Sequence, residues 1–316
     1  MTIDTPAVLS GWPPPVLDPA GPFAGPVATV AWVLFVMGAV VLILVLIALG
    51  VALFGPPRWK RRVAGEKLVW IGGPAFPVVV LAALLIYGLS VTARVADAPR
   101  HGEMRVRVTG EMWWWRVAYL DDQGREIVQD ANEVHIPAGR PVVLELESAD
   151  VIHSVWIPRL GGKTDMIPGR RNFMRLQADA PGVYAGQCAG YCGGPHALMG
   201  VVVVAHAPAD FAAWRLRQAA PAAASTLPGA AVFTASGCGA CHTIRGTEAN
   251  GLAGPDLTHV GSRQTLGAGI LPNNQGTMAG WIADSQGIKP GNRMPSYSVL
   301  SGQELRDVAA YLESLK

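Results

Sequence analysis

The segment that most constrains this chain is 187–200, which reads Q-C-A-G-Y-C-G-G-P-H-A-L-M-G. Its thiolates, imidazole and thioether come from Cys188, Cys192, His196 and Met199, a soft or borderline ligand set that suits copper. The glycines and the proline between these ligands disfavour both a helix and a ladder strand, so the chain can fold tightly around an ion. The spacing also differs from the paired C-x2-C patterns of zinc sites. The segment therefore predicts a metal-binding loop, with copper preferred over zinc.

The number of thiolates indicates how many copper ions the loop holds. A mononuclear blue-copper site uses two imidazoles, one thiolate and a weak thioether, so this loop has one thiolate too many. Two thiolates can bridge two copper ions, and each ion then needs its own imidazole. The candidate for the second imidazole is His153, in the stretch V-I-H-S-V-W-I-P.

A second motif, C-G-A-C-H, supplies Cys238, Cys241 and His242. C-x-x-C alone is compatible with a redox disulfide pair, but the histidine that follows makes it the signature of covalent haem attachment. Met278 and Met294 compete as the distal ligand, and Met294 is favoured because it follows a P-G-N-R turn. All four cysteines of the chain then serve metal or haem chemistry, which points to a compartment outside the cytoplasm.

Two long apolar runs lie near the N-terminus, at residues 27–54 and 68–90. The first has no charged residue and is ample to cross a hydrocarbon core of about 30 Å. The loop 55–67 contains R-W-K-R-R and is expected on the cytoplasmic side, which puts both chain ends outside. Residues 1–26 carry no lysine or arginine, so they do not read as a secretory signal.

After these runs the pattern changes to short alternating strands separated by Gly, Pro and Asp turns, which predicts an all-β sandwich or barrel. The copper loop lies between the last two strands, and His153 opens another strand. Alternation places Trp113 and Trp115 on one face of their strand and Trp114 on the other. The formal net charge of +2 excludes a strongly basic nucleic-acid binder.

The copper loop, His153 and L-G-G-K-T-D-M-I-P-G-R at 160–170 closely resemble subunit II of haem-copper cytochrome c oxidase, whose dinuclear copper centre is called CuA. The C-terminal part, with C-G-A-C-H, G-P-D-L and M-P, resembles a class I cytochrome c. The resemblance implies a multidomain chain with a two-helix transmembrane hairpin, an all-β cupredoxin-like CuA domain and an all-α class I cytochrome c domain. The expected segments are an extracytoplasmic N-terminal segment 1–26, transmembrane helices 27–54 and 68–90 with the loop 55–67 between them, the CuA domain 98–218, a flexible linker 219–228 and the cytochrome domain 229–316.

The resemblance also implies site residues. Cys188 and Cys192 would bridge two copper ions. The further ligands would be His153 and Met199 on one copper, and His196 and the backbone carbonyl of Gly190 on the other. One haem c would be held by Cys238, Cys241, His242 and Met294. Trp113 would be the port between haem and copper; packing in the core or at the membrane interface is its alternative role. Many relatives have a glutamate where this chain has Gly190, and the carboxylate of that glutamate reaches a magnesium ion. Because Gly190 has no carboxylate, magnesium is doubtful here.

The expected function is that of a terminal oxidase subunit that passes electrons from haem c to CuA and on to subunit I, which reduces oxygen and pumps protons. Expected partners are subunit I and the other oxidase subunits, membrane lipid, and reduced cytochrome c or another donor. A bacterial inner membrane, with both redox domains on the periplasmic side, is the expected location. The rival functions are a membrane-anchored copper and haem carrier and a CuA-containing denitrification reductase. The remaining histidines, His101, His135, His206 and His259, are expected to be surface or packing residues.

Overall fold

The computed structural model describes residues 15–95 and 102–316. The chain forms two compact units, one spanning Gly25–Asp97 and the other made of the remaining N-terminal residues with Ala98–Lys316. His101 lies outside the described residues.

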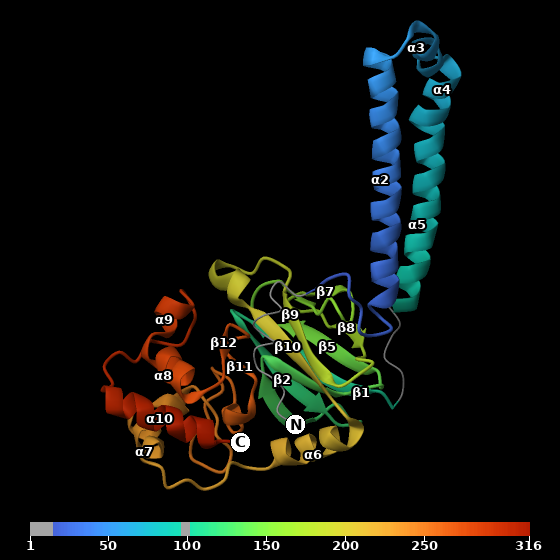
Figure 1. The fold of residues 1–316 in the computed structure, drawn as a ribbon. Coiled ribbons are helices and arrows are strands. Elements are labelled where there is room, and N and C mark those ends of the chain that lie inside the picture. The colour runs from blue at the N-terminus through green and yellow to red at the C-terminus, as the bar shows by residue number, and fades with distance from the viewer. Residues whose placement is uncertain (1–14, 96–101) are drawn as a thin grey trace. The chain divides into compact units, whose positions relative to one another are not determined.

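The first unit is a hairpin of apolar helices (Figure 1). Helix α2, Gly25–Phe54, contains no charged residue, and short helices α3, Pro57–Val63, and α4, Glu66–Trp70, carry the basic loop. A π-helical turn, Ile71–Ala75, accommodates Pro74 before helix α5, Phe76–Val95. Gly25–Phe54 and Glu66–Ala93 are each long and apolar enough to cross a membrane, which fits a membrane-anchored protein.

The second unit contains a sandwich of two five-stranded sheets, drawn in green and yellow in Figure 1. One sheet has the order β3 (Glu126–Ala131), β2 (Trp114–Leu120), β1 (Met104–Glu111), β5 (Val142–Ser148) and β8 (Asn172–Leu176). The other has the order β4 (Glu133–Pro137), β10 (Gly200–His206), β9 (Gly182–Cys188), β6 (His153–Trp156) and β7 (Lys163–Met166). The pairs β1–β5 and β4–β10 are parallel, and the other pairs are antiparallel.

Inward-facing residues of both sheets form one continuous apolar core, which includes Val106, Trp115, Leu144, Ile157 and Val203. Such a core is the main source of stability of a sandwich, because burial of apolar surface contributes about 25 cal/mol per Å². The core also fixes which strand ends meet. The all-β sandwich predicted from strand alternation is confirmed, and it is the cupredoxin-like domain that the resemblance implies.

Helix α6, Pro208–Ala219, follows the last strand and buries Phe211 and Trp214. The expected linker 219–228 overlaps the last residue of this helix, and its first residues are hydrogen-bonded. Arg245 donates to the carbonyl oxygen of Ala219 at 3.0 Å, and Ala222 N–H donates to Arg245 O at 2.8 Å. The backbone at the start of the connection is therefore hydrogen-bonded to the C-terminal domain.

The C-terminal domain is helical, with helices α7 (Pro228–Ala235), α8 (Gln275–Ala283), α9 (Ser285–Ile288) and α10 (Gly302–Ser314), and a small sheet of β11 (Thr265–Leu266) and β12 (Leu271–Pro272). Capping boxes at Asn274 and Ser301 begin α8 and α10 by satisfying the free N–H groups of the first turn. Helix α10 packs on α7 and α8 through Val308 and Tyr311. The expected all-α cytochrome domain is confirmed.

The histidines expected to be packing or surface residues include three in the described part of the chain. His135 is buried and stacks on Trp214, with ring centroids 4.2 Å apart, and its Nδ1 lies 2.8 Å from His206 Nε2. His259 is also buried, and its Nε2 lies 3.0 Å from the carbonyl oxygen of Ala220. All three have packing roles.

Candidate metal and haem centres

The copper loop connects β9 and β10 and brings all of its soft ligands together. Cys188 Sγ lies 3.8 Å from Cys192 Sγ, 3.9 Å from His153 Nδ1 and 3.2 Å from the carbonyl oxygen of Gly190. Cys192 Sγ is 3.4 Å from His196 Nδ1 and 3.8 Å from Met199 Sδ. One nitrogen or sulfur atom each from His153, Cys188 and Cys192 lies within 4.8 Å of the others. The chain therefore places a thiolate, imidazole and thioether donor set around one small volume.

The sandwich explains why these side chains converge. Val155 of β6 pairs with Cys188 of β9, which places the start of β6, His153, beside the loop. Cys188 N–H donates to the carbonyl oxygen of Met199 at 2.8 Å, so the two ends of the loop are tied together. Gly193 has φ 110°, a backbone conformation that side chains with a Cβ rarely adopt, and the loop reverses there.

Asp150 orients the imidazole of His153. Its Oδ1 lies 2.9 Å from His153 Nε2, so Nδ1 faces the thiols, as expected of a metal-binding imidazole held by a carboxylate. The backbone N–H groups of Met112 and Val151 also donate to Asp150, both at 2.8 Å. Burial opposes protonation of His153, but Cys188 and Asp150 outweigh it and raise the pKa of the imidazole.

The two thiols cannot both ionise easily without a cation between them. Burial disfavours ionisation of Cys188, yet the hydrogen bond with His153 and backbone hydrogen bonds lower the pKa of this thiol overall. Burial and the neighbouring Cys188 raise the pKa of Cys192 to about 12. Binding of both sulfurs as thiolates therefore requires local positive charge, which copper ions supply, so the donor set fits copper.

A cavity of about 360 Å³ lies beside the C-G-A-C-H motif. Cys238, Cys241, His242, Met278 and Met294 all line it. Its apolar lining and its position over the two cysteines fit a covalently attached haem.

His242 is oriented so that one ring nitrogen would be free to bind the haem iron. Its Nδ1 donates to the carbonyl oxygen of Pro255 at 2.8 Å, which leaves Nε2 as the free nitrogen. A Cβ built on Gly254 would lie 2.6 Å from His242 Cε1, so only glycine allows the imidazole this position. Burial lowers the pKa of His242, which keeps the imidazole neutral and able to bind a metal.

The two competing methionines differ in their surroundings. Met278 is 2% exposed and belongs to the apolar core of the cytochrome domain, whereas Met294 is half-buried on a loop. Ser285 and Gln286 donate to the carbonyl oxygen of Met294, at 2.8 and 2.7 Å. These bonds fix the backbone of the Met294 loop at the cavity.

Trp113 lies between the two centres. It is in the turn between β1 and β2 rather than on a strand, so the expectation that alternation sets its direction is wrong. Its indole Nε1–H donates to the carbonyl oxygen of Cys192 at 2.8 Å, and Trp113 also lines the haem cavity. Trp114 lines the same cavity, and buried Trp115 donates to Gly200 O at 2.9 Å.

Several residues of this region were not found by sequence reasoning. Asp150 lies three residues before His153, a spacing that could have suggested a carboxylate partner. Lys289 is 2% exposed, and its Nζ donates to the carbonyl oxygens of Trp113 and Gly267. No sequence pattern distinguishes Lys289 from a surface lysine.

The comparisons with known proteins agree with this arrangement. The family model described as "Cytochrome C oxidase subunit II, periplasmic domain" matches residues 120–206, and the model described as "Cytochrome c" matches residues 227–316. "Cytochrome c oxidase subunit 2" of Alkalihalophilus pseudofirmus is 35% identical, covering 95% of this chain and 90% of that protein. The protein of the same name from Bacillus subtilis is 29% identical, covering 98% of this chain and 95% of that protein.

Among solved structures, the periplasmic domain of subunit II of cytochrome oxidase (CoxB) of Bradyrhizobium japonicum is 28% identical with a TM-score of 0.36, covering 39% of this chain and 96% of that chain.

The first of these relatives is aligned over nearly the whole chain, so the likeness extends beyond the copper domain to the hairpin and the cytochrome domain. The matched families bind copper and haem c, for which the described residues provide fitting donors. The chain therefore belongs to the cytochrome c oxidase subunit II family, in a form with a C-terminal cytochrome c domain, and is one subunit of a haem-copper terminal oxidase.

Proposed function

We propose that electrons cross from the cytochrome domain to the copper domain of this subunit through Trp113. The proposal rests on one observation. The side chain of Trp113 lines the haem cavity and also donates a hydrogen bond to the backbone carbonyl of Cys192 in the copper loop. A Cβ on Gly193 would lie 3.1 Å from Trp113 Cζ2, so the indole ring also packs closely on the loop. This continuous contact is a short route between the two centres.

When bound, haem c and copper supply one-electron redox chemistry. We assign one haem to Cys238, Cys241, His242 and Met294. For the copper pair we assign Cys188 and Cys192 as bridging thiolates, with the other ligands His153, Met199, His196 and the carbonyl of Gly190. The short separations within this set support the assignment. The protein's part is to hold these donors in place, so that little geometry has to change when the charge changes.

The location follows from the charge of the hairpin. Residues 57–63 carry Arg58, Lys60, Arg61 and Arg62 between the two apolar helices. Because basic loops stay in the cytoplasm, we place both redox domains on the periplasmic side of the inner membrane. Subunit I accepts the electrons, and a reduced cytochrome c or another donor supplies them to the cytochrome domain.

The test is flash reduction of haem c in the purified complex, followed by absorbance of the copper centre. Trp113→Ala should slow the transfer by about tenfold or more, because it removes the ring that connects the two centres. Misplacing reacting groups by only about 1 Å can already change a rate by this much. Trp113→Phe keeps an aromatic ring but loses the hydrogen bond to Cys192, and should give an intermediate rate.

Trp114→Ala is the matched control. Trp114 also lines the cavity, but in the described residues it has no hydrogen bond to the copper loop. Its removal should change the rate much less than Trp113→Ala does. A wild-type rate in Trp113→Ala would reject the port.

A further inference from the structure

The loop after α9, K-P-G-N-R-M at 289–294, reaches from the cytochrome domain to the copper domain at several points. Lys289 Nζ donates to the carbonyl oxygen of Trp113 at 2.7 Å and to Gly267 O at 2.9 Å. Arg293 Nη2 lies 3.5 Å from Asp150 Oδ2, on the carboxylate that orients His153. The same loop ends in Met294 at the haem cavity. The loop 289–294 therefore contacts Trp113 and Asp150, which hold parts of the copper site in place, and it also lines the haem cavity.

Lys289 is unusual among these residues because its ammonium group is buried. Its exposed fraction is 2%, and in the described part of the chain no carboxylate lies within ion-pair distance. Burial lowers the pKa of its ammonium group to about 7. Burying a lysine whose only partners are carbonyl oxygens is costly, because its charge is removed from water without a counter-charge. Its presence calls for a role other than stability.

The carbonyl that Lys289 holds belongs to the hairpin turn that carries Trp113. The same turn is held at Met112, whose N–H donates to Asp150 Oδ2 at 2.8 Å, and at the indole Nε1, which donates to Cys192 O at 2.8 Å. A Cβ on Gly291 would lie 3.9 Å from Trp113 Cη2 and Cζ3, so the loop also borders the indole ring. Two of these three hydrogen bonds come from the copper domain. Lys289 provides the third, and it alone comes from the cytochrome domain.

We propose that Lys289 is a positioning residue for electron transfer: it fixes Trp113 from the haem side, so that the indole bridges the haem cavity and the copper loop. This inference rests on the proposed function, because it assumes that Trp113 is the port. Because this hydrogen bond comes from the cytochrome domain, it forms only while that domain is docked.

The test uses the purified oxidase complex with Lys289→Met, which keeps the length and apolar stem of the side chain but removes both hydrogen bonds. Lys316→Met, the same change at an exposed position of the same domain, is the control. Haem c to copper transfer after flash reduction should slow by about tenfold or more in Lys289→Met and not in the control. Lys289→Gln keeps N–H donors on a shorter, uncharged side chain and should give an intermediate rate, which keeps the proposal testable if Lys289→Met does not assemble.

Hydrogen–deuterium exchange of the complex separates positioning from docking. In Lys289→Met, exchange of the backbone amides at 112–116 should become faster, while 263–266, at the domain interface, should be unchanged. Faster exchange in both segments would mean that Lys289 only holds the domains together, and would overturn the proposal. A wild-type transfer rate in Lys289→Met, with Trp113→Ala slowed, would overturn it while leaving the port intact. A wild-type rate in Trp113→Ala would reject the port itself.

Discussion

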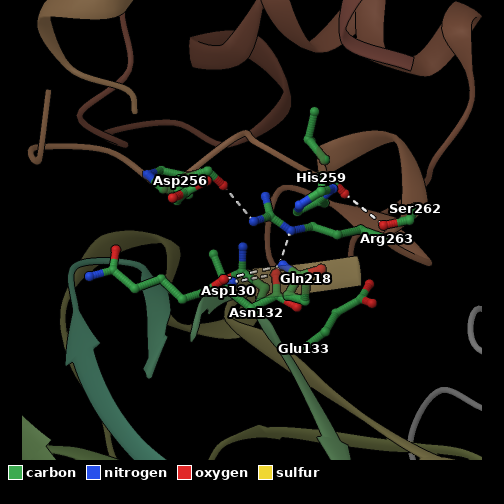
Figure 2. A network of polar contacts seen from close by, with 12 residues as sticks. Asp130, Asn132, Glu133, Gln218, Asp256, His259, Ser262 and Arg263 are labelled. Atoms are coloured by element: carbon green, nitrogen blue, oxygen red, sulfur yellow. Dashed lines mark hydrogen bonds and ion pairs between the residues drawn. The ribbon is translucent and has the colours of Figure 1, made fainter. Parts of the chain in front are cut away.

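Arg263 Nε lies 2.8 Å from Asp130 Oδ1, with 6% and 3% of the two side chains exposed, and this pair joins the cytochrome domain to β3 of the copper domain (Figure 2). Arg263 also donates to the carbonyl oxygen of Asp256 at 2.5 Å. Beside it, Glu133 Oε1 accepts from the backbone N–H of Gln264 at 2.7 Å and of Thr265 at 2.9 Å. The buried Arg263–Asp130 pair and the backbone hydrogen bonds to Glu133 favour one docked arrangement of the two domains over a loosely tethered one.

Asp130→Asn should loosen this docking strongly. The change leaves the Arg263 guanidinium buried without its counter-charge, and breaking a buried pair in this way costs about 3–5 kcal/mol. Chemical unfolding of the soluble fragment 98–316, followed by haem absorbance and tryptophan fluorescence, measures the loss. Asp122→Asn, at an exposed turn position, should change the unfolding free energy by less than about 0.5 kcal/mol. Equal stabilities of the two variants would contradict the role of the pair.

Cys192→Ser should remove both copper ions or leave a mononuclear site, because Cys192 is assigned as a bridge between them. Haem c should stay attached, since Cys238 and Cys241 belong to the other domain. The measurement is the copper-to-haem ratio of the purified fragment 98–316 together with its near-infrared copper absorption. An unchanged ratio with an intact band would show that Cys192 does not bridge.

Gly254→Ala should impair haem incorporation. The new Cβ would meet the His242 ring at 2.6 to 3.1 Å, and the imidazole would have to leave its place beside the cavity. Haem content and the absorption band of methionine-ligated haem report the effect. Gly280→Ala is the control: it lies in α8, where nothing is within 4 Å of an added Cβ, so haem content should be normal. Normal haem ligation in Gly254→Ala would mean that the domain can shift to make room.

His206 should make the copper domain less stable in acid. Burial and the neighbouring His135 lower the pKa of His206 to about 4, below its ordinary value of 6.5. The unfolded chain then binds a proton between these two pH values and the folded chain does not. Stability is therefore complete above pH 6.5 and falls as the pH drops towards 4.

The size of this loss should be roughly 2 kcal/mol at pH 4, allowing for the partial exposure of the imidazole. Unfolding free energies of the soluble fragment between pH 7.5 and pH 4 measure it. His206→Gln should show a smaller drop over the same range. An identical pH profile in the two proteins would exclude His206 as the cause.

The fold, the soft donor atoms of the copper loop and the haem-attachment motif could be predicted because each is encoded locally. Each rests on a continuous stretch of sequence whose chemistry requires those residue types. These stretches are the ligand spacing at 188–199, C-x-x-C-H at 238–242 and the uncharged run at 27–54. The docking contacts could not be predicted. Asp130 and Arg263 are far apart in the chain, and each by itself has the character of a surface residue.

Two other features are not visible in the sequence pattern. Trp113 is predicted to lie on a strand, yet the strand begins only at Trp114. The connection after α6 has the composition of a flexible linker, but Arg245 and His259 bind its backbone from a domain that follows it in the chain. Contacts between domains leave no periodic signal in a sequence.

Magnesium should not bind through this subunit at the copper loop. The resemblance places glutamate at position 190 in many relatives, whereas Gly190 offers only its backbone carbonyl. The structure adds a steric reason, because a Cβ at this position would lie 2.9 Å from Ser154 Oγ. Ser154 in turn donates to Asp165, which holds it in place and lowers the pKa of that carboxyl group together with Lys163. A carboxylate at 190 would therefore need both a new side chain and a displaced serine.

Manganese, which replaces magnesium and is paramagnetic, provides the measurement. Cells are grown in manganese, and electron paramagnetic resonance of the purified complex is recorded. The wild-type complex should show no stoichiometric manganese signal coupled to the copper centre. The double variant Gly190→Glu with Ser154→Gly creates both the carboxylate and the space for it, and should gain such a signal if subunit I supplies the remaining ligands. A coupled signal in the wild-type complex would show that other residues form the site and that Gly190 does not decide whether the metal binds.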